Sequence, residues 1–212
     1  MLYSAEARWF FNTGLPAEVG DWFLEGRTIE PESRTDRYLI FPGCDCLGVK
    51  LRESDDANTG AFEVKALIGA PEITRFSPRA TARTDAWVKW TCSTEAFPDW
   101  VEAILASESS WVTIQKHRSS RRFSLDGNGC AEVPKDSEPK EGCDVEIVTL
   151  QVDGDPWWTF GFESFGPRET VRPSLHAVAT RWFERDGPCT FGVVQSLSYA
   201  TWVAGFVGSA AR

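Results

Sequence analysis

The segments LGVKLR (residues 47–52) and FEVKAL (residues 62–67) decide the fold, because each alternates charged and apolar side chains. Read as two strands, they place Lys50 and Arg52 on one face, and Glu63 and Lys65 on one face of the partner. Such a charged face is usually in contact with water, while the apolar face forms the core. The alternative is a barrel whose charged lumen binds a ligand and whose apolar outer face is covered by helices.

The composition is that of a globular protein with an acidic exterior. The chain has 212 residues, of which 42% are hydrophobic and 25% charged, and its formal net charge is −9. This charge argues against general binding of nucleic acid or of an anionic membrane, but it leaves room for a small buried basic site. We find no linker and no internal repeat, and expect residues 1–212 to form a single domain. Without an apolar N-terminal segment or membrane-spanning run, we expect a cytoplasmic protein.

Motifs of several other enzyme classes are absent from the sequence. It contains no G-x-x-x-x-G-K-[ST] loop, no G-x-G-x-x-G loop and no G-x-S-x-G elbow. The six cysteines, which include Cys44 and Cys46, form no C-x-x-C unit, and we expect reduced thiols without a chemical role. His117 and His176 are expected to be structural.

Alternation of polar and apolar residues continues over most of the chain and predicts eight or nine strands with three or four helices. Strands are predicted at residues 3–11, 36–41, 47–52, 62–67, 86–92, 111–118, 121–125, 144–152 and 157–165, and helices at residues 15–25, 94–107 and 174–184. Residues 72–84 are ambiguous, and residues 191–206 are predicted as strand followed by helix. Most connections are short turns, such as Asp153-Gly154, so we expect antiparallel pairing.

Charged residues dominate the polar face of strand after strand, although a merely solvated face would mix in Thr, Ser, Gln and Asn freely. The pattern therefore favours the charged lumen. Ile114 shares a face with Lys116, which indicates either a bulge or an error in the predicted register. The charged residues of these faces are Glu6, Arg8, Lys50, Arg52, Glu63, Lys65, Lys89, Lys116, Arg118, Glu146 and Glu163.

The order of these motifs resembles the CYTH superfamily of triphosphate tunnel enzymes. Ser4-Ala5-Glu6-Ala7-Arg8 holds the places of the family's E-x-E-x-K strand, and Lys50-Leu51-Arg52 resembles its strand with two basic residues. Phe62-Glu63-Val64-Lys65 resembles its strand that ends in lysine. The later parts are similar as well: Lys116-His117-Arg118 to a K-x-R strand, Glu146 and Glu163 to the acidic strands, and residues 198–203 (SYATWV) to an S-Y-x-x-L-L signature.

The resemblance implies an α+β fold, namely an antiparallel eight-stranded β-barrel with a charged lumen and a few helices packed outside. It also implies metal-dependent hydrolysis of an inorganic or organic triphosphate, with Mg²⁺ or Mn²⁺ as cofactor. The residues it assigns are Glu6, Lys65 and Arg52 for catalysis, Arg8, Lys50, Arg52, Lys65, Lys89, Lys116, Arg118 and Arg122 for the substrate, and Glu6, Glu146 and Glu163 for the metal.

One departure from the family pattern keeps an alternative open. Ser4 stands where the family has its first glutamate, which puts metal affinity in doubt, although Asp144 beside Glu146 can compensate. The alternative is a non-catalytic polyphosphate- or nucleotide-binding protein. A carrier of an apolar ligand ranks last, because the inward positions hold Lys and Arg. The expected partner is a small-molecule triphosphate or polyphosphate, with no nucleic acid and no membrane.

Overall fold

The computed structural model describes residues 2–52, 60–94, 111–126 and 129–205. The predicted helix at residues 94–107 lies almost wholly outside these ranges, as does the turn at residues 53–60. The elements are β1 (Leu2–Phe11), α1 (Ala17–Leu24), β2 (Glu32–Leu39), β3 (Leu47–Arg52), β4 (Ala61–Leu67), β5 (Glu72–Ser77), β6 (Ala80–Ser93), β7 (Trp111–Asp126), β8 (Gly129–Val133), β9 (Gly142–Val152), β10 (Asp155–Gly166), α3 (Val171–Trp182), the 3₁₀-helix η3 (Val193–Gln195) and α4 (Tyr199–Ala204).

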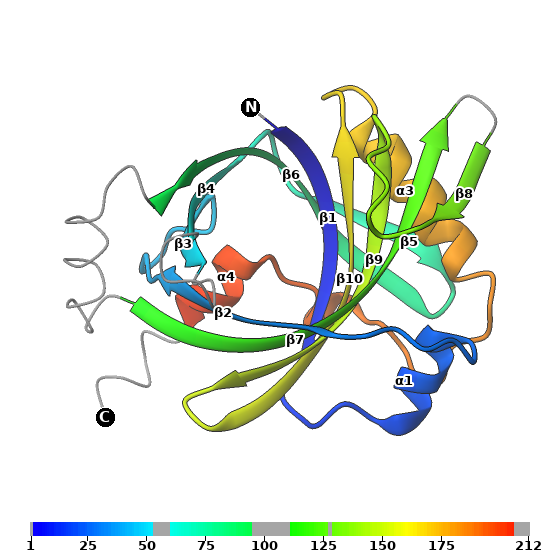
Figure 1. The fold of residues 1–212 in the computed structure, drawn as a ribbon, viewed down its shortest axis with the longest axis horizontal. Coiled ribbons are helices and arrows are strands. Elements are labelled where there is room, and N and C mark those ends of the chain that lie inside the picture. Colours follow the sequence, from blue (N-terminus) through cyan, green and yellow to red (C-terminus); the bar gives the residue numbers. More distant parts are fainter. Residues whose placement is uncertain (1, 53–59, 95–110, 127–128, 206–212) are drawn as a thin grey trace.

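Eight strands close into an antiparallel barrel, as the sequence predicted. They follow the order β1-β10-β9-β7-β2-β3-β4-β6, and β6 pairs back with β1. β5 extends the sheet from β6, and β8 pairs with β7 (Figure 1). The turn between β9 and β10 has positive φ at both Asp153 and Gly154, as a tight two-residue hairpin requires.

The outer face of the barrel carries an aromatic core under α1 and α3. On β1 the outward residues Ala5, Ala7 and Trp9 are buried, because the small alanines let neighbouring elements approach and Trp9 fills the space beyond them. The rest of this cluster comes mainly from β10, from the two helices and from the segment after α3. Its largest members are Trp9, Phe23, Phe160, Phe162, Trp182 and Phe191.

A second apolar cluster lies between α4 and lumen-facing side chains at one end of the barrel. Figure 1 shows α4 beside β3. Trp202 of α4 stacks on Phe10 of β1, with ring centroids 4.6 Å apart. Ile114 belongs to this cluster, and β7 pairs with β2 and β9 without any shift of register. The shared face of Ile114 and Lys116 is therefore neither a bulge nor a register error. It marks the point where the lumen changes from apolar to charged.

Three strands are longer or start elsewhere than the sequence indicated. β2 begins at Glu32 rather than at residue 36, since its polar first residues pair with Lys116, His117 and Arg118 on β7. β7 runs unbroken through residues 119 and 120, and β6 begins at Ala80, so the ambiguous residues 72–84 form the β5–β6 hairpin. Long-range pairing, which local patterns do not reveal, decides each case.

Helices in the described ranges are short. The longest, α3, has 12 residues, and none of them is both long and apolar enough to cross a membrane.

Candidate functional site

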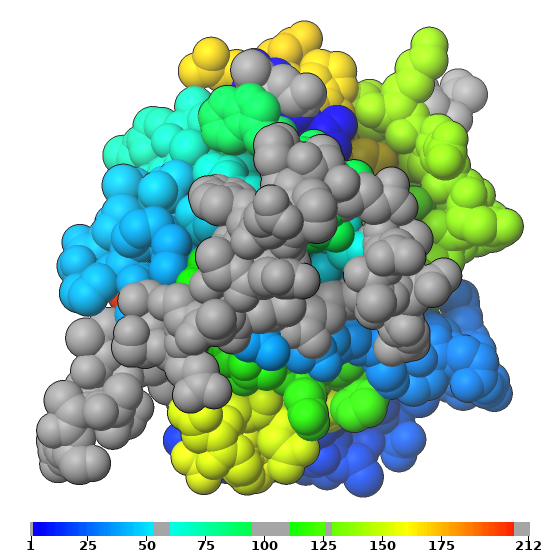
Figure 2. Space-filling model, turned by 60° about the vertical axis from the view of Figure 1, so that its left-hand side comes forward, coloured from blue at the N-terminus to red at the C-terminus, as the bar shows by residue number. Residues whose placement is uncertain are grey.

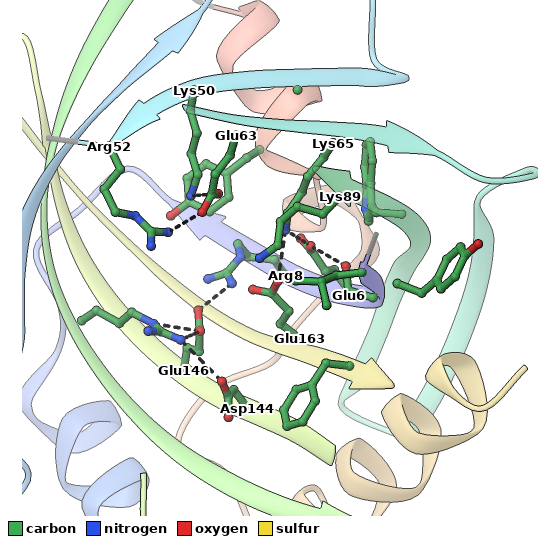
Figure 3. A pocket seen from close by; sticks show the side chains of 18 of the residues that line it. Glu6, Arg8, Lys50, Arg52, Glu63, Lys65, Lys89, Asp144, Glu146 and Glu163 are labelled. Carbon is green, nitrogen blue, oxygen red and sulfur yellow. Dashed lines mark hydrogen bonds and ion pairs between the residues drawn. The ribbon is translucent and has the colours of Figure 1, made fainter. Parts of the chain in front are cut away.

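Alternate residues of the barrel strands point into one cavity with a volume of about 640 Å³. β3 and the segment 138–140 after β8 both contribute to its wall, and lie on opposite sides of the face in Figure 2. Figure 3 shows bases and carboxylates from several strands pointing toward one another in this lumen. Every residue that the sequence assigned to catalysis, substrate or metal lines it: Glu6, Arg8, Lys50, Arg52, Lys65, Lys89, Lys116, Arg118, Arg122, Glu146 and Glu163.

On one wall of the lumen, Lys50 and Arg52 of β3 share one carboxylate of β4. Lys50 Nζ lies 2.8 Å from Glu63 Oε2, and Arg52 NH2 lies 3.1 Å from Glu63 Oε1. Lys50 stands directly opposite Glu63 in the β3–β4 register, so the alternation of the two segments brings these charges together. Burial lowers the pKa of Lys50 to about 8, although Asp36 and Glu63 act in the opposite direction. This ammonium is therefore easier to deprotonate than that of an ordinary lysine.

Lys65 of β4 reaches across the lumen to carboxylates on two other strands. Its Nζ lies 3.1 Å from Glu163 Oε1 of β10 and donates a second hydrogen bond to Glu6 Oε1 of β1. Glu6 and Glu163 stand directly opposite each other in the β1–β10 register, so the Lys65 ammonium can bind both carboxylates. Burial alone lowers the pKa of Lys65, but the two carboxylates outweigh burial and raise the pKa above its ordinary value. Lys65 thus stays charged at neutral pH.

The opposite wall holds a chain of arginines and carboxylates from β1, β7 and β9. Both oxygens of Glu146 are engaged: Oε2 lies 2.8 Å from Arg8 NH2, and Oε1 lies 2.8 Å from Arg118 Nε. Arg122 binds Asp144 in a bidentate manner, with both contacts at 2.8 Å. Burial raises the pKa of Glu146, but Arg118 and Arg8 act more strongly together and lower it to about 2. Glu146 is therefore ionised near neutral pH.

A deep cluster joins the charged part of the lumen to its apolar end. Lys116 Nζ lies 2.8 Å from Asp36 Oδ2 and 2.6 Å from the Tyr38 hydroxyl. The same ammonium sits 4.1 Å from the ring centre of Tyr199 on α4. Asp36 acts to raise the pKa of Lys116, but burial has the stronger effect and lowers this pKa to about 8. Helix α4 thus also contributes to the site.

Sequence reasoning missed the contribution of β2. Arg34 and Tyr38 line the cavity, and Asp36, which is 0% exposed, pairs with Lys116 and, at 3.8 Å, with Lys50. A signal was present in the alternation of Arg34, Asp36 and Tyr38. It was obscured because the predicted strand began only at residue 36.

Residues expected to be structural do lie outside the lumen. The His117 ring is 2.7 Å from Ser33 Oγ, on the face of β7 opposite Lys116. Arg121 binds Glu132 and Glu25, and its guanidinium lies 4.8 Å from the Trp182 ring centre. His176 packs near Phe76 on the outer face. Arg121 thus points outward, while the neighbouring Arg122 lines the cavity.

The lumen carboxylates do not form a ready metal site. Glu146 and Asp144 have both oxygens bound by guanidinium groups, and Glu6 and Glu163 share the ammonium of Lys65. Within the described ranges, no group of three or more His, Cys, Asp or Glu side chains is arranged to hold a metal ion. A metal would have to displace bases from these carboxylates, so its binding by Glu6, Glu146 and Glu163 stays a prediction.

Comparison with known proteins finds similarity only among solved structures. No protein-family model matches the chain, and no curated protein matches it. A conserved hypothetical protein from Pyrococcus furiosus has 11% identity and a TM-score of 0.46, with coverage of 93% of this chain and 98% of that one. The PH1819 protein from Pyrococcus horikoshii has 13% identity and a TM-score of 0.46, with coverage of 95% and 98%.

A candidate adenylate cyclase from Bacillus halodurans is similar at the same level. It has 12% identity and a TM-score of 0.41, over 87% of this chain and 94% of that one. Similarities with these values do not identify an activity for the chain.

Proposed function

We propose that the barrel lumen binds a small molecule through a triphosphate or polyphosphate chain. The observation that carries the proposal is the concentration of bases in one cavity. Ten basic side chains line it against seven carboxylates, whereas the whole chain has 22 basic and 31 acidic residues. A basic lumen inside an acidic protein favours an anionic ligand, and six strands supply nine of the ten bases.

A phosphate chain fits the distribution of these bases better than a single small anion does. Arg8, Arg52 and Arg118 carry guanidinium groups, which bind phosphate oxygens in pairs, and Lys65 and Lys89 add point charges. Partial burial lowers the local dielectric constant and strengthens each of these interactions relative to water. A long polyanion can contact several of the bases at once, which one phosphate group cannot.

Membership of the CYTH superfamily is part of the proposal. Its support is the order of the sequence motifs together with their placement, since the charged residues of the strand motifs line the lumen of a closed eight-stranded barrel. Ser198 of the last motif caps α4 by accepting a hydrogen bond from the Thr201 backbone N–H, and Tyr199 then reaches the site. The first glutamate of the first motif is missing, as Ser4 stands there.

Hydrolysis of the bound chain is the second candidate function. The observation in its favour is a row of carboxylates, since Glu6, Glu163 and Asp144 are directly opposite one another across β1, β10 and β9. Catalysis by Glu6, Lys65 and Arg52, with Mg²⁺ or Mn²⁺, stays a prediction. Binding and orientation of the phosphate chain by the bases need no metal ion.

The test is calorimetric titration with inorganic triphosphate and with inorganic phosphate, combined with a phosphate-release assay in Mg²⁺, Mn²⁺ or EDTA. We expect triphosphate to bind and to raise the melting temperature, because a ligand that binds only the folded state stabilises it. Single phosphate is expected to bind much more weakly. Absence of triphosphate binding at low salt would overturn the proposal. Binding without phosphate release would exclude hydrolysis under these conditions and support a protein that only binds the phosphate chain.

A further inference from the structure

Two thiols lie side by side in the loop that joins β2 to β3. The Sγ atoms of Cys44 and Cys46 are 3.6 Å apart. Cys46 is exposed and Cys44 is partly exposed, so a small reagent can reach the pair from solvent. All six cysteines of the chain are free thiols in the structure. The C-x-C spacing alone predicted no chemical role, and it is the distance between the two sulfurs that indicates one.

A tight turn fixes the position of Cys44. Its N–H donates to the Phe41 carbonyl at 3.1 Å, with Pro42 and Gly43 between the two residues. Gly43 has a φ of 71°, and proline followed by a glycine of positive φ is typical of a type II turn. The proline ring restricts φ, and few residues other than glycine adopt a positive φ, so this turn has little conformational freedom.

The two residues that follow the turn are held against neighbouring strands. The Cys46 carbonyl accepts a hydrogen bond of 2.8 Å from the Leu67 N–H at the end of β4. Asp45 Oδ2 lies 3.4 Å from Arg83 NH2 of β6, so the side chain between the two cysteines has its own partner. A disulfide bond needs about 2.0 Å between the sulfurs, and each sulfur has to move by less than about 1 Å to reach it. The backbone is thus already close to the conformation of the oxidised form.

A bond between these two cysteines is poorly suited to stabilise the fold. It closes a loop of residues 44–46 only, and the stabilisation that a disulfide gives by restricting the unfolded chain decreases with the length of the closed loop. Exposed disulfides are also easily reduced, and disulfides of this kind are usually regulatory or catalytic. The pair is therefore suited to reversible oxidation.

We propose that Cys44 and Cys46 form a redox-active dithiol that reacts with low-molecular-weight disulfides. One cysteine thiolate attacks a sulfur of the external disulfide, which forms a mixed disulfide and releases a first thiolate. The second cysteine gives up its proton and attacks the protein sulfur of the mixed disulfide, which releases the second thiolate. The two released thiolates take up the two protons, so the dithiol is oxidised to a disulfide while the external disulfide is reduced to two thiols.

The contact between the sulfurs assigns the order of the two attacks. The hydrogen bond to Cys44 and the charge of Cys44 raise the pKa of Cys46. Cys46 therefore keeps its proton while Cys44 is the thiolate, and the thiolate is the nucleophile. Cys44 makes the first attack, and Cys46 resolves the mixed disulfide.

The experiment is incubation of the protein with oxidised glutathione, followed by alkylation with iodoacetamide and mass spectrometry of the intact protein and its peptides. We expect a disulfide between Cys44 and Cys46, joint loss of alkylation at both, and recovery of both thiols with dithiothreitol. In Cys46→Ser the glutathione on Cys44 should persist, because no second thiol displaces it. Cys92→Ser is the matched control, since it removes an exposed thiol on β6 and should leave the disulfide unchanged.

Two outcomes would overturn the dithiol. In one, Cys44 and Cys46 each retain glutathione without forming a bond to each other. In the other, neither reacts under conditions in which Cys92 does. If Cys44→Ser traps glutathione on Cys46 as fast as Cys46→Ser traps it on Cys44, the assigned order of attack is wrong. Each substitution replaces one sulfur by oxygen at an accessible position, so we expect the variants to fold. The inference does not depend on phosphate binding in the lumen.

Discussion

Two adjacent residues of β1 are equally buried and chemically opposite. Trp9 faces outward at 0% exposure, and the ring centres of Phe160 and Phe191 lie 6.1 Å and 5.3 Å from its own. Arg8 faces the lumen at 4% exposure, with its guanidinium 2.8 Å from Glu146. Burial of an aromatic ring stabilises a fold, whereas burial of a charge costs free energy that a partner only offsets. We therefore expect the outer cluster to set the free energy of unfolding, and the lumen to set the affinity for an anion.

The largest effect is expected for Trp9→Ala. Removal of the indole leaves a cavity among at least four rings and also removes the hydrogen bond from Nε1 to the Thr81 carbonyl. We expect the free energy of unfolding to fall by about 3–5 kcal/mol, measured by denaturant titration. Ile73→Ala is the control, since Ile73 is 65% exposed and its truncation should change the free energy of unfolding by less than about 0.5 kcal/mol. If the two substitutions lower the free energy of unfolding by equal amounts, the outer cluster does not set the stability of the fold.

A substitution in the lumen should affect stability and affinity in opposite directions. Glu146→Gln leaves Arg8 and Arg118 without their shared carboxylate, which should lower the free energy of unfolding by about 3 kcal/mol. The same change makes the lumen more positive, so inorganic triphosphate should bind more tightly. Glu138→Gln removes a carboxylate from the exposed rim of the cavity and should have a small effect on both. Weaker triphosphate binding by Glu146→Gln would instead favour a direct role of Glu146 in holding the ligand through a metal.

Local alternation predicted the strands and favoured a charged lumen, because inward and outward residues differ so strongly in polarity, and the resemblance to the CYTH superfamily then implied the eight-stranded barrel. Ser4, Glu6 and Arg8 against Ala5, Ala7 and Trp9 leave no doubt about the two faces of β1. The pattern was less informative where a strand is polar on both faces, as at the start of β2, or where its lumen face becomes apolar, as at Ile114. There the partner strands and α4 decide the structure, and one sequence does not reveal them.

The residues that the sequence assigned to a site come together in one cavity, which other residues also line. They all line the cavity, because a closed barrel turns every inward charge toward the same space. Asp36 was missed because the predicted strand began only at that residue, and Tyr199 was given no role because it follows the barrel in sequence. The sequence also does not predict which base pairs with which carboxylate, because this depends on how β4 faces β1 and β10 across the lumen.

Loss of lumen bases should weaken the binding of inorganic triphosphate. Arg52→Ala and Lys65→Ala together should weaken inorganic triphosphate binding about a hundredfold, because each removes a charged contact of about tenfold value. Arg52 shares Glu63 with Lys50, so Glu63 retains one base after the substitution. Arg75→Ala on the exposed β5 is the control for a lost positive charge. Unchanged affinity in the double variant would remove both residues from the phosphate site.

The smallest expected effect is a dependence on alkaline pH that separates affinity from stability. Burial lowers the pKa of Lys50 and of Lys116 to about 8, below the ordinary value of about 10.4 that applies to the unfolded chain. Between these values the unfolded chain binds more protons, so the contribution of both lysines to the free energy of unfolding rises from about pH 8 to about pH 10. Over the same interval the lumen loses positive charge, and triphosphate affinity should fall about fivefold by pH 9.

The variant Lys50→Arg tests the origin of this pH dependence, since a guanidinium stays protonated throughout the interval. We expect calorimetric titrations at pH 7 and pH 9 to give a smaller loss of affinity for Lys50→Arg than for the unmodified protein. An equal loss in both proteins would place the titrating group elsewhere. Over this pH interval the free energy of unfolding is expected to rise and the affinity for triphosphate to fall, and both changes have one cause. The charged lysines of the lumen attract an anion, but their burial as charged groups makes the fold less stable.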